Sequence, residues 1–231
     1  MKKARITSGI PGLDKLIEGG FKKNSVNLVA GDPGAGKTIF AIQFLIEGCK
    51  KEEPGIYITF EEKKEKLYEN TLAFGFDLNK YEKQGKFRFL EYTPEQVKKV
   101  LIEGGGLVEI LIEKIKAKRI VIDSITSFSL LYENELIKKE AALALFDLIN
   151  KWNCTAVLTS QTKSADHETV MDAALEFEVD GIILLYHSKK KGERIRAIEI
   201  LKMRGTKIPP KTYELNFGDS GLYVTNNIIR L

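Results

Sequence analysis

The chain has 231 residues, 43% of them hydrophobic, which is ample material for the core of one large domain. Its 36 basic and 32 acidic residues are interspersed, and the resulting net charge of +4 neither demands nor excludes nucleic acid as a partner. The sequence has no apolar run long enough for a membrane span, no apolar core of a signal peptide and only two cysteines, so we expect a cytoplasmic protein that does not contact the membrane.

Hydrophobic patterns alternate between strand and helix along the first three quarters of the chain. Helical patterns cover residues 37–51, 61–75 and 94–118, the last with a soft point at the glycines of 104–106. Strand patterns cover residues 25–31, 55–60, 86–92, 119–124, 154–161 and 180–187. The middle strands are apolar on both faces and are separated by helices, which is typical of a parallel sheet that helices cover on both sides.

The pattern changes after residue 187. "SKKKGE" (188–193) is too short for a helix, so we expect a turn followed by an antiparallel strand, "RIRAIEI" (194–200). Strand patterns at 213–217 and 221–225 continue in the same way. With no internal repeat and no low-complexity linker, the predicted fold is a single α/β domain, 1–231. It has a mostly parallel central sheet flanked by helices and antiparallel C-terminal strands.

"GDPGAGKT" (31–38) fits the pattern G-x-x-x-x-G-K-[ST] between a strand and a helix, which is the context of a P-loop. Its glycines let backbone N–H groups face a phosphate, and the helix N-terminus adds its positive dipole end. The lysine is expected to reach the β- and γ-phosphates, and the threonine hydroxyl to bind Mg²⁺. The predicted contacts with the nucleotide are Gly31, Asp32, Pro33, Gly34, Ala35, Gly36, Lys37 and Thr38.

Polar residues also follow three other predicted strands, at the edge where ligands of open α/β sheets bind. Asp123 fits the Walker B aspartate that holds Mg²⁺ through water, although it or Ser124 could instead cap the next helix. Glu61 and Glu62 fit a base that positions the attacking water, although acidic residues also favour the start of a helix. The pair at 160–161, Ser-Gln, could sense the γ-phosphate or simply end a strand.

"LKMRGT" (201–206) places Lys202 and Arg204 two residues apart at the end of a late strand. On a strand both side chains would point to one face and Met203 to the other. Paired positive charge is a common protection of exposed sheet edges. A positive side chain supplied in trans by a neighbouring subunit can also stabilise the negative charge of the transition state in phosphoryl transfer.

With these motifs in order, nearly the whole chain resembles the KaiC family of RecA-like ATPases, in its single-domain, archaeal form. "SGIPGLDKLIEGGF" is similar to the family's opening segment, and "GDPGAGKT", "TFEE", "RIVIDS" and "LKMRGT" follow in the family's order. The resemblance implies a RecA-like core and a homo-oligomeric ring, usually a hexamer, with ATP and Mg²⁺ between subunits. It also implies that Glu61 and Glu62 serve the attacking water, and that Lys202 and Arg204 reach the γ-phosphate on a neighbouring subunit. By the same resemblance, "AFGF" (73–76), Phe177 and Asp219 lie near the nucleotide.

Three functions remain open at this stage. The first is a slow regulatory ATPase, with room for a protein partner. A circadian role is not expected, because the clock protein has two such domains and an autophosphorylated tail that has no counterpart here. The second is a DNA-dependent ATPase or recombinase of the RecA/RadA type, although the segment 161–178 carries one lysine and five acidic residues where a DNA-facing loop should be basic. The third is a regulator that binds ATP without hydrolysing it.

Overall fold

A mixed sheet of nine strands forms the centre of the computed structural model, which describes residues 4–93, 96, 99–100, 104, 106–129, 132, 134–161, 163–165, 168–170, 178–190 and 192–230. From one edge to the other the strands are β13 (Gly221–Ile228), β12 (Thr212–Gly218), β11 (Glu193–Met203), β10 (Gly181–Lys190), β3 (Val26–Gly31), β7 (Thr155–Gln161), β6 (Arg119–Asp123), β4 (Gly55–Thr59) and β5 (Phe87–Glu91). The strands from β10 to β5 are parallel, and β11, β12 and β13 are antiparallel, as the sequence predicts.

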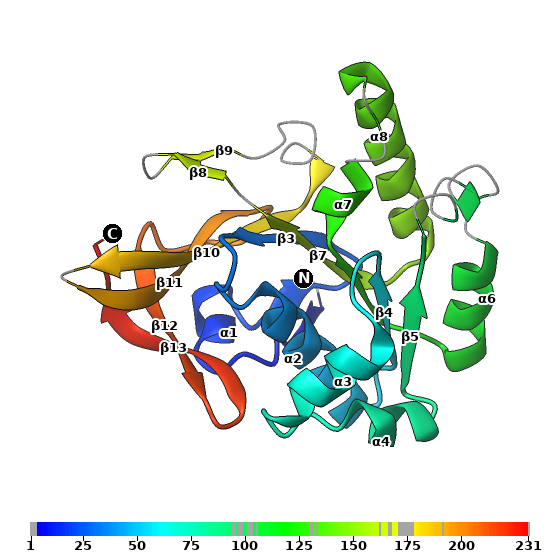
Figure 1. Cartoon of the computed structure of the whole chain (residues 1–231), viewed down its shortest axis with the longest axis horizontal. Coiled ribbons are helices and arrows are strands. Elements are labelled where there is room, and N and C mark those ends of the chain that lie inside the picture. The colour runs from blue at the N-terminus through cyan, green and yellow to red at the C-terminus, as the bar shows by residue number, and fades with distance from the viewer. Residues whose placement is uncertain are drawn as a thin grey trace.

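Helices cover both faces of this sheet (Figure 1). One layer holds α1 (Leu13–Leu16), α2 (Lys37–Lys50), α3 (Lys64–Leu72) and α4 (Leu78–Lys83). The other holds α6 (Gly106–Ile115), α7 (Ile125–Ser129) and α8 (Glu135–Lys151). Two short strand pairs lie outside the main sheet: β1 (Arg5–Ile6) with β2 (Phe21–Lys22), and β8 (Lys163–Ala165) with β9 (Glu168–Val170). Among the described residues, no helix combines the length and apolarity needed to cross a bilayer.

The two-residue alternation of the parallel strands divides the hydrophobic core into two clusters. In β3, Val29 packs with the α2 layer, whereas Leu28 and Ala30 pack with the α8 layer. In β6, Val121 faces α2, whereas Ile120 and Ile122 face α8. Strands buried on both faces explain the continuous apolar runs in the sequence, and the same alternation decides which polar side chains at the strand ends face α2.

The predicted elements differ from the observed ones mainly at their ends. Helix α3 ends at Leu72 rather than near Gly75, and a separate helix, α4, follows before β5. Strands β10 and β11 extend into "SKKKGE", so the connecting turn is shorter than predicted. Of the helix predicted over 94–118, α6 forms the second half, and the first half falls largely outside the described residues.

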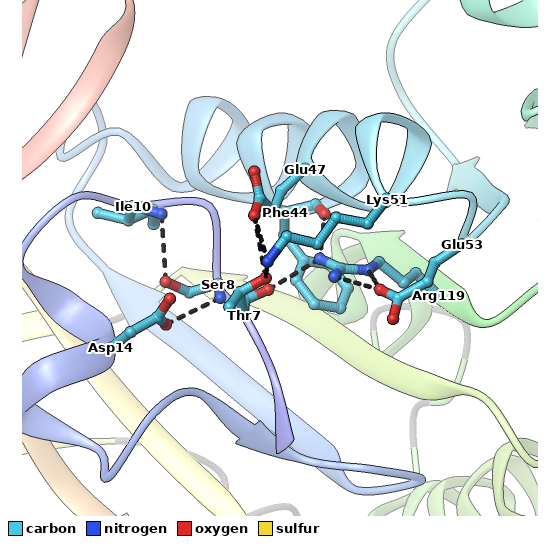
Figure 2. A network of polar contacts seen from close by, with 9 residues as sticks. All are labelled: Thr7, Ser8, Ile10, Asp14, Phe44, Glu47, Lys51, Glu53 and Arg119. Carbon is cyan, nitrogen blue, oxygen red and sulfur yellow. Dashed lines mark hydrogen bonds and ion pairs between the residues drawn. The ribbon is translucent and has the colours of Figure 1, made fainter. Parts of the chain in front are cut away.

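A network of polar contacts ties the N-terminal segment to the end of α2 (Figure 2). Its centre is the fully buried guanidinium of Arg119, which donates to Glu53 Oε2 at 2.5 and 3.0 Å. The guanidinium also donates to the carbonyls of Thr7 at 2.9 Å and Phe44 at 2.7 Å, and it lies 4.6 Å from the centre of the Phe44 ring. A buried charge is tolerated only when it is paired and hydrogen-bonded, and these contacts meet both conditions.

Gly48 explains how this arginine fits beside the helix. It lies inside α2, where glycine is normally unfavourable by about 0.5–1 kcal/mol relative to alanine. A Cβ at this position would lie 2.5 Å from Arg119 Cδ, closer than real contacts allow. The glycine therefore lets Arg119 pass against the backbone of the helix that begins at the P-loop.

Candidate nucleotide site

The P-loop connects the buried strand β3 to helix α2. Gly34 and Gly36 have φ angles of 78° and 107°, which L side chains rarely adopt. A Cβ on Gly36 would also lie 3.1 Å from the Phe217 ring, and one on Gly34 would lie 3.2 Å from the ring of His187. The backbone conformation therefore favours glycine at these two positions, and neighbouring side chains leave little room for a Cβ.

Lys37 is the first residue of α2, and its ammonium group folds back over the loop. Nζ donates to the carbonyl oxygens of Gly31 at 2.8 Å and Asp32 at 2.9 Å. Burial lowers the pKa of Lys37 below its ordinary value, while the negative charges of Asp123 and Asp32 act in the opposite direction. The lysine thus lies in the loop whose amides would surround a phosphate, as a P-loop requires.

Asp123 ends β6 and accepts hydrogen bonds from three hydroxyl groups. Thr38 Oγ1 donates to Oδ2 at 2.8 Å, Tyr57 Oη donates to the same oxygen at 2.6 Å, and Thr159 Oγ1 donates to Oδ1 at 2.5 Å. Asp123 and Thr38, which the sequence analysis assigns separately to Mg²⁺, therefore lie in contact with each other.

This donor set fits Mg²⁺, which prefers oxygen ligands and usually combines one or two protein groups with waters and phosphates. Thr38 would supply a hydroxyl ligand, and Asp123 would accept from a metal-bound water. No group of three or more His, Cys, Asp or Glu side chains in the described part of the chain could form a metal cage by itself.

The two glutamates that follow β4 lie in different environments. Their backbone amides both donate to Thr59 Oγ1, at 3.3 Å for Glu61 and 3.2 Å for Glu62. Glu61 is exposed, whereas Glu62 is partly buried. Burial and the negative charge of Asp123 raise the pKa of Glu62, and the positive charge of Lys66 opposes this shift.

An open pocket of about 290 Å³ lies beside the start of α2. Its lining comprises Gly34, Gly36, Lys37, Thr38, Ile39, Phe74 and Phe217. The rings of Phe74 and Phe217 lie 5.7 Å apart and tilted at 36°, so they form one aromatic wall. Such a wall next to a phosphate-binding loop suits the flat, apolar face of a nucleobase.

Strands β10 and β11 contact the P-loop through two side chains, His187 and Arg196. His187 and Arg196 face each other in the register of the two strands. His187 Nδ1 lies 3.4 Å from the carbonyl oxygen of Pro33, and Arg196 Nε donates to the carbonyl of Gly34 at 3.2 Å. The Arg196 guanidinium also lies 4.8 Å from the centre of the Phe217 ring, so it connects the P-loop with the aromatic wall.

The remaining predicted residues are placed less directly. Ser160 Oγ lies 3.3 Å from Thr126 Oγ1, and the Gln161 amide donates to that hydroxyl at 2.8 Å, so this pair is linked to α7. Asp219 is exposed in the β12–β13 turn, two residues after Phe217. Phe177 lies outside the described residues.

Lys202 and Arg204 lie at the opposite end of the sheet from their own P-loop. The sequence analysis places both residues at the end of a strand, but only Lys202 is in β11. The strand ends at Met203, so Arg204 belongs to the following turn. Met203 is buried, Lys202 is half-buried and Arg204 is exposed, which agrees with the predicted alternation. The glycine after Arg204 has a φ of 62°, and a Cβ there would lie 2.5 Å from Nζ of Lys22.

Sequence reasoning missed several residues of this site. Tyr57, Thr159 and Arg196 each lie within a strand, where period-two patterning indicates only which face they occupy. Phe217 is one aromatic among several in the C-terminal strands. The alternation of β4, β6 and β7 could have placed Tyr57 and Thr159 on the face of Asp123, but only if the strand order had been known.

Comparison with known proteins finds relatives that match nearly the whole length of this chain. The family model described as KaiC ATPase matches residues 6–228. The UPF0273 protein of Pyrococcus furiosus is 34% identical over 95% of this chain and 93% of its own length. The circadian clock protein KaiC3 of a Synechocystis species is 33% identical over 87% of this chain but only 41% of its own length. A KaiC-like protein of Pyrococcus horikoshii, solved by crystallography, has a TM-score of 0.85 and 36% identity, covering 96% of this chain and 99% of that one.

Proposed function

The chain belongs to the KaiC family of ATPases and has its RecA-like fold, and we propose that it binds ATP with Mg²⁺ and hydrolyses it slowly at sites that two subunits share. The observation that carries the proposal is the arrangement at the ends of β3, β6 and β4. There Lys37 lies within the P-loop, Thr38 contacts Asp123 at 2.8 Å, and the partly buried Glu62 follows β4. These are the groups that would bind the phosphates, hold the metal and activate water.

The aromatic pocket supplies a place for the base. A nucleotide whose phosphates lie on the P-loop amides could extend its base between the start of α2 and the wall of Phe74 and Phe217. The pocket is open, and its volume of about 290 Å³ is slightly below the range of roughly 300–1,000 Å³ for small-molecule sites. Both features support a site that a second subunit completes.

The position of Arg204 supports action on a neighbouring subunit. Its amide donates to the carbonyl of Asp180, and the Asp180 amide donates to the carbonyl of Val26, so Arg204 is level with the first residue of β3. The P-loop begins at Gly31, five residues further, which is about 17 Å along a strand. Within one chain the pair is therefore remote from the P-loop, whereas a head-to-tail contact would bring it to the P-loop of the next copy.

Repeated head-to-tail contacts close into a ring when the rotation allows it. We propose such a ring, hexameric as the family resemblance implies, with the cation-bearing corner of one subunit against the nucleotide pocket of the next. That corner includes Lys22, whose ammonium lies beside the turn at Gly205. Slow turnover at shared sites suits a regulatory role in which nucleotide state sets the contacts between subunits or with a protein partner.

Lys37→Ala should weaken ATP binding in the presence of Mg²⁺ by roughly ten- to a hundredfold. The reason is that a hydrogen bond to a charged group contributes about 1.5–3 kcal/mol. Calorimetric titration with a non-hydrolysable ATP analogue measures the change. Lys50→Ala is the matched control, because Lys50 is an exposed lysine in the last turn of the same helix. Equal affinity in the folded Lys37→Ala protein and the wild type would contradict the proposal.

The DNA-dependent alternative makes a different prediction. Because 161–178 is acidic, single-stranded DNA should leave the rate of ATP hydrolysis unchanged, and any binding should be weak. Turnover measured with and without a single-stranded oligonucleotide, at two salt concentrations, checks this. Tight, salt-sensitive binding that accelerates hydrolysis would instead favour the recombinase function.

A further inference from the structure

The Walker B carboxylate is held from both of its oxygens by hydroxyl groups of the two neighbouring strands. Tyr57 of β4 donates to Oδ2 at 2.6 Å, and Thr159 of β7 donates to Oδ1 at 2.5 Å. The register explains the convergence, because Thr59 lies opposite Asp123, so that Tyr57 is two residues earlier on the same face of β4. All three residues face the α2 layer, where the P-loop helix begins.

Packing holds the Tyr57 side chain in this position. The side chain is fully buried, and its ring stacks on that of Phe89 with centroids 5.9 Å apart and planes 14° apart. Its phenol is the donor in the 2.6 Å contact, because an ionised aspartate can only accept. A fixed ring with a permanent donor can hold a carboxylate in one orientation.

The number of hydrogen bonds that Asp123 can accept limits where a metal-bound water can donate to it. A carboxylate offers about four lone-pair sites. Thr38 and Tyr57 occupy those of Oδ2, and Thr159 occupies one of Oδ1. One site on Oδ1 remains, besides any site that Thr38 vacates when its hydroxyl contacts a metal. The direction in which Asp123 can accept from a metal-bound water is therefore set by the two strand hydroxyls.

We propose that Tyr57 and Thr159 are positioning residues that orient Asp123 toward the water shell of nucleotide-bound Mg²⁺. The proposal rests on the proposed function, because it needs Mg²⁺·ATP at the P-loop. It adds that part of the metal affinity comes from two strand residues that would not touch the nucleotide or the metal. Groups that orient a metal's ligands typically change its affinity by 10- to 100-fold when they are lost.

A purely structural explanation also exists, because a buried tyrosine needs a hydrogen-bond partner wherever it lies. In that case removal of the hydroxyl would lower the stability of the fold but would not alter the response to metal. The two explanations therefore differ in the Mg²⁺ dependence of nucleotide binding, which can be measured without turnover.

The experiment compares Tyr57→Phe with wild type and with Tyr68→Phe. Tyr68 is a matched control, since it is also buried, its ring meets Phe89 edge-on at 6.1 Å, and its phenol donates to a carboxylate, Glu82, at 3.0 Å. Binding of a fluorescent, non-hydrolysable ATP analogue is titrated at increasing Mg²⁺ concentration and in EDTA, and melting temperatures are recorded. We expect the Mg²⁺ concentration at half-maximal effect to rise 10- to 100-fold in Tyr57→Phe and to stay at the wild-type value in Tyr68→Phe, with affinity in EDTA unchanged in both.

An unchanged Mg²⁺ midpoint in Tyr57→Phe, beside a wild type that needs Mg²⁺, would overturn the inference and leave the proposed function intact. The proposed function would instead be contradicted if the wild type bound no nucleotide, or if its nucleotide affinity did not depend on the Mg²⁺ concentration. If Tyr57→Phe does not fold, Thr159→Val replaces it, because it deletes the hydroxyl on the other carboxylate oxygen. Its midpoint is expected to rise as well, and an unchanged midpoint would equally overturn the inference.

Discussion

Arg204→Ala should slow ATP hydrolysis by roughly 10³- to 10⁵-fold, the range that an arginine acting in trans contributes to phosphoryl transfer. The guanidinium would stabilise charge that develops on the γ-phosphate of the neighbouring subunit. Its loss should leave the P-loop of its own subunit intact, so nucleotide affinity measured with a non-hydrolysable analogue should change far less than the rate. Lys207→Ala is a matched control, because it removes an exposed cation three residues further along the same loop.

Complementation decides whether the arginine acts in trans. Arg204→Ala and Lys37→Ala, each nearly inactive alone, are mixed under conditions that allow subunits to exchange. Some interfaces then combine an intact P-loop from the first variant with an intact arginine from the second, and activity should partly return. Native mass spectrometry establishes that mixed rings have formed. Mixed rings without recovered activity would contradict action across the interface.

Glu61→Gln combined with Glu62→Gln should reduce the hydrolysis rate by roughly 10²- to 10⁴-fold while ATP binding persists. Glutamine keeps the size of glutamate but cannot accept a proton from water. The raised pKa of Glu62 favours this residue as the base, because a base is most effective when its pKa approaches the working pH. A base must be deprotonated, so activity should fall as the pH is lowered through the pKa of Glu62, at a higher pH than for an ordinary glutamate.

Single variants and a control separate the two residues. Glu62→Gln alone should account for most of the loss if the partly buried residue is the base, and Glu61→Gln alone if the exposed one is. Glu69→Gln, an exposed glutamate of α3, should leave the rate unchanged. Near-normal turnover in the double variant would assign the base elsewhere. A wild type that binds Mg²⁺·ATP but shows no turnover would favour the non-hydrolysing regulator.

The sequence predicted the features that depend on short segments of chain. The P-loop was evident because its glycines, lysine and threonine occur at fixed spacing between a strand and a helix, and both glycines at 34 and 36 do have positive φ angles. The parallel core followed from apolar strands separated by helices, and the antiparallel end from "SKKKGE", which leaves no room for a helix. Thr38 and Asp123 could both be assigned to Mg²⁺ because each belongs to a motif at the carboxyl end of a predicted strand.

Other features depend on which strands lie side by side, and sequence patterning does not contain that order. The sequence alone determined the class of fold, the phosphate-binding loop and the carboxylates at the strand ends, because each rests on local conformation and period-two patterning. The tertiary structure alone decided that Tyr57 and Thr159 meet on Asp123 and that Arg196 joins the P-loop to Phe217. It also placed Arg204 at the opposite end of the sheet from its own P-loop. The physical reason is that these contacts join segments far apart in the sequence. The order of the strands brings such segments together, and that order depends on the packing of the whole sheet and not on any single segment.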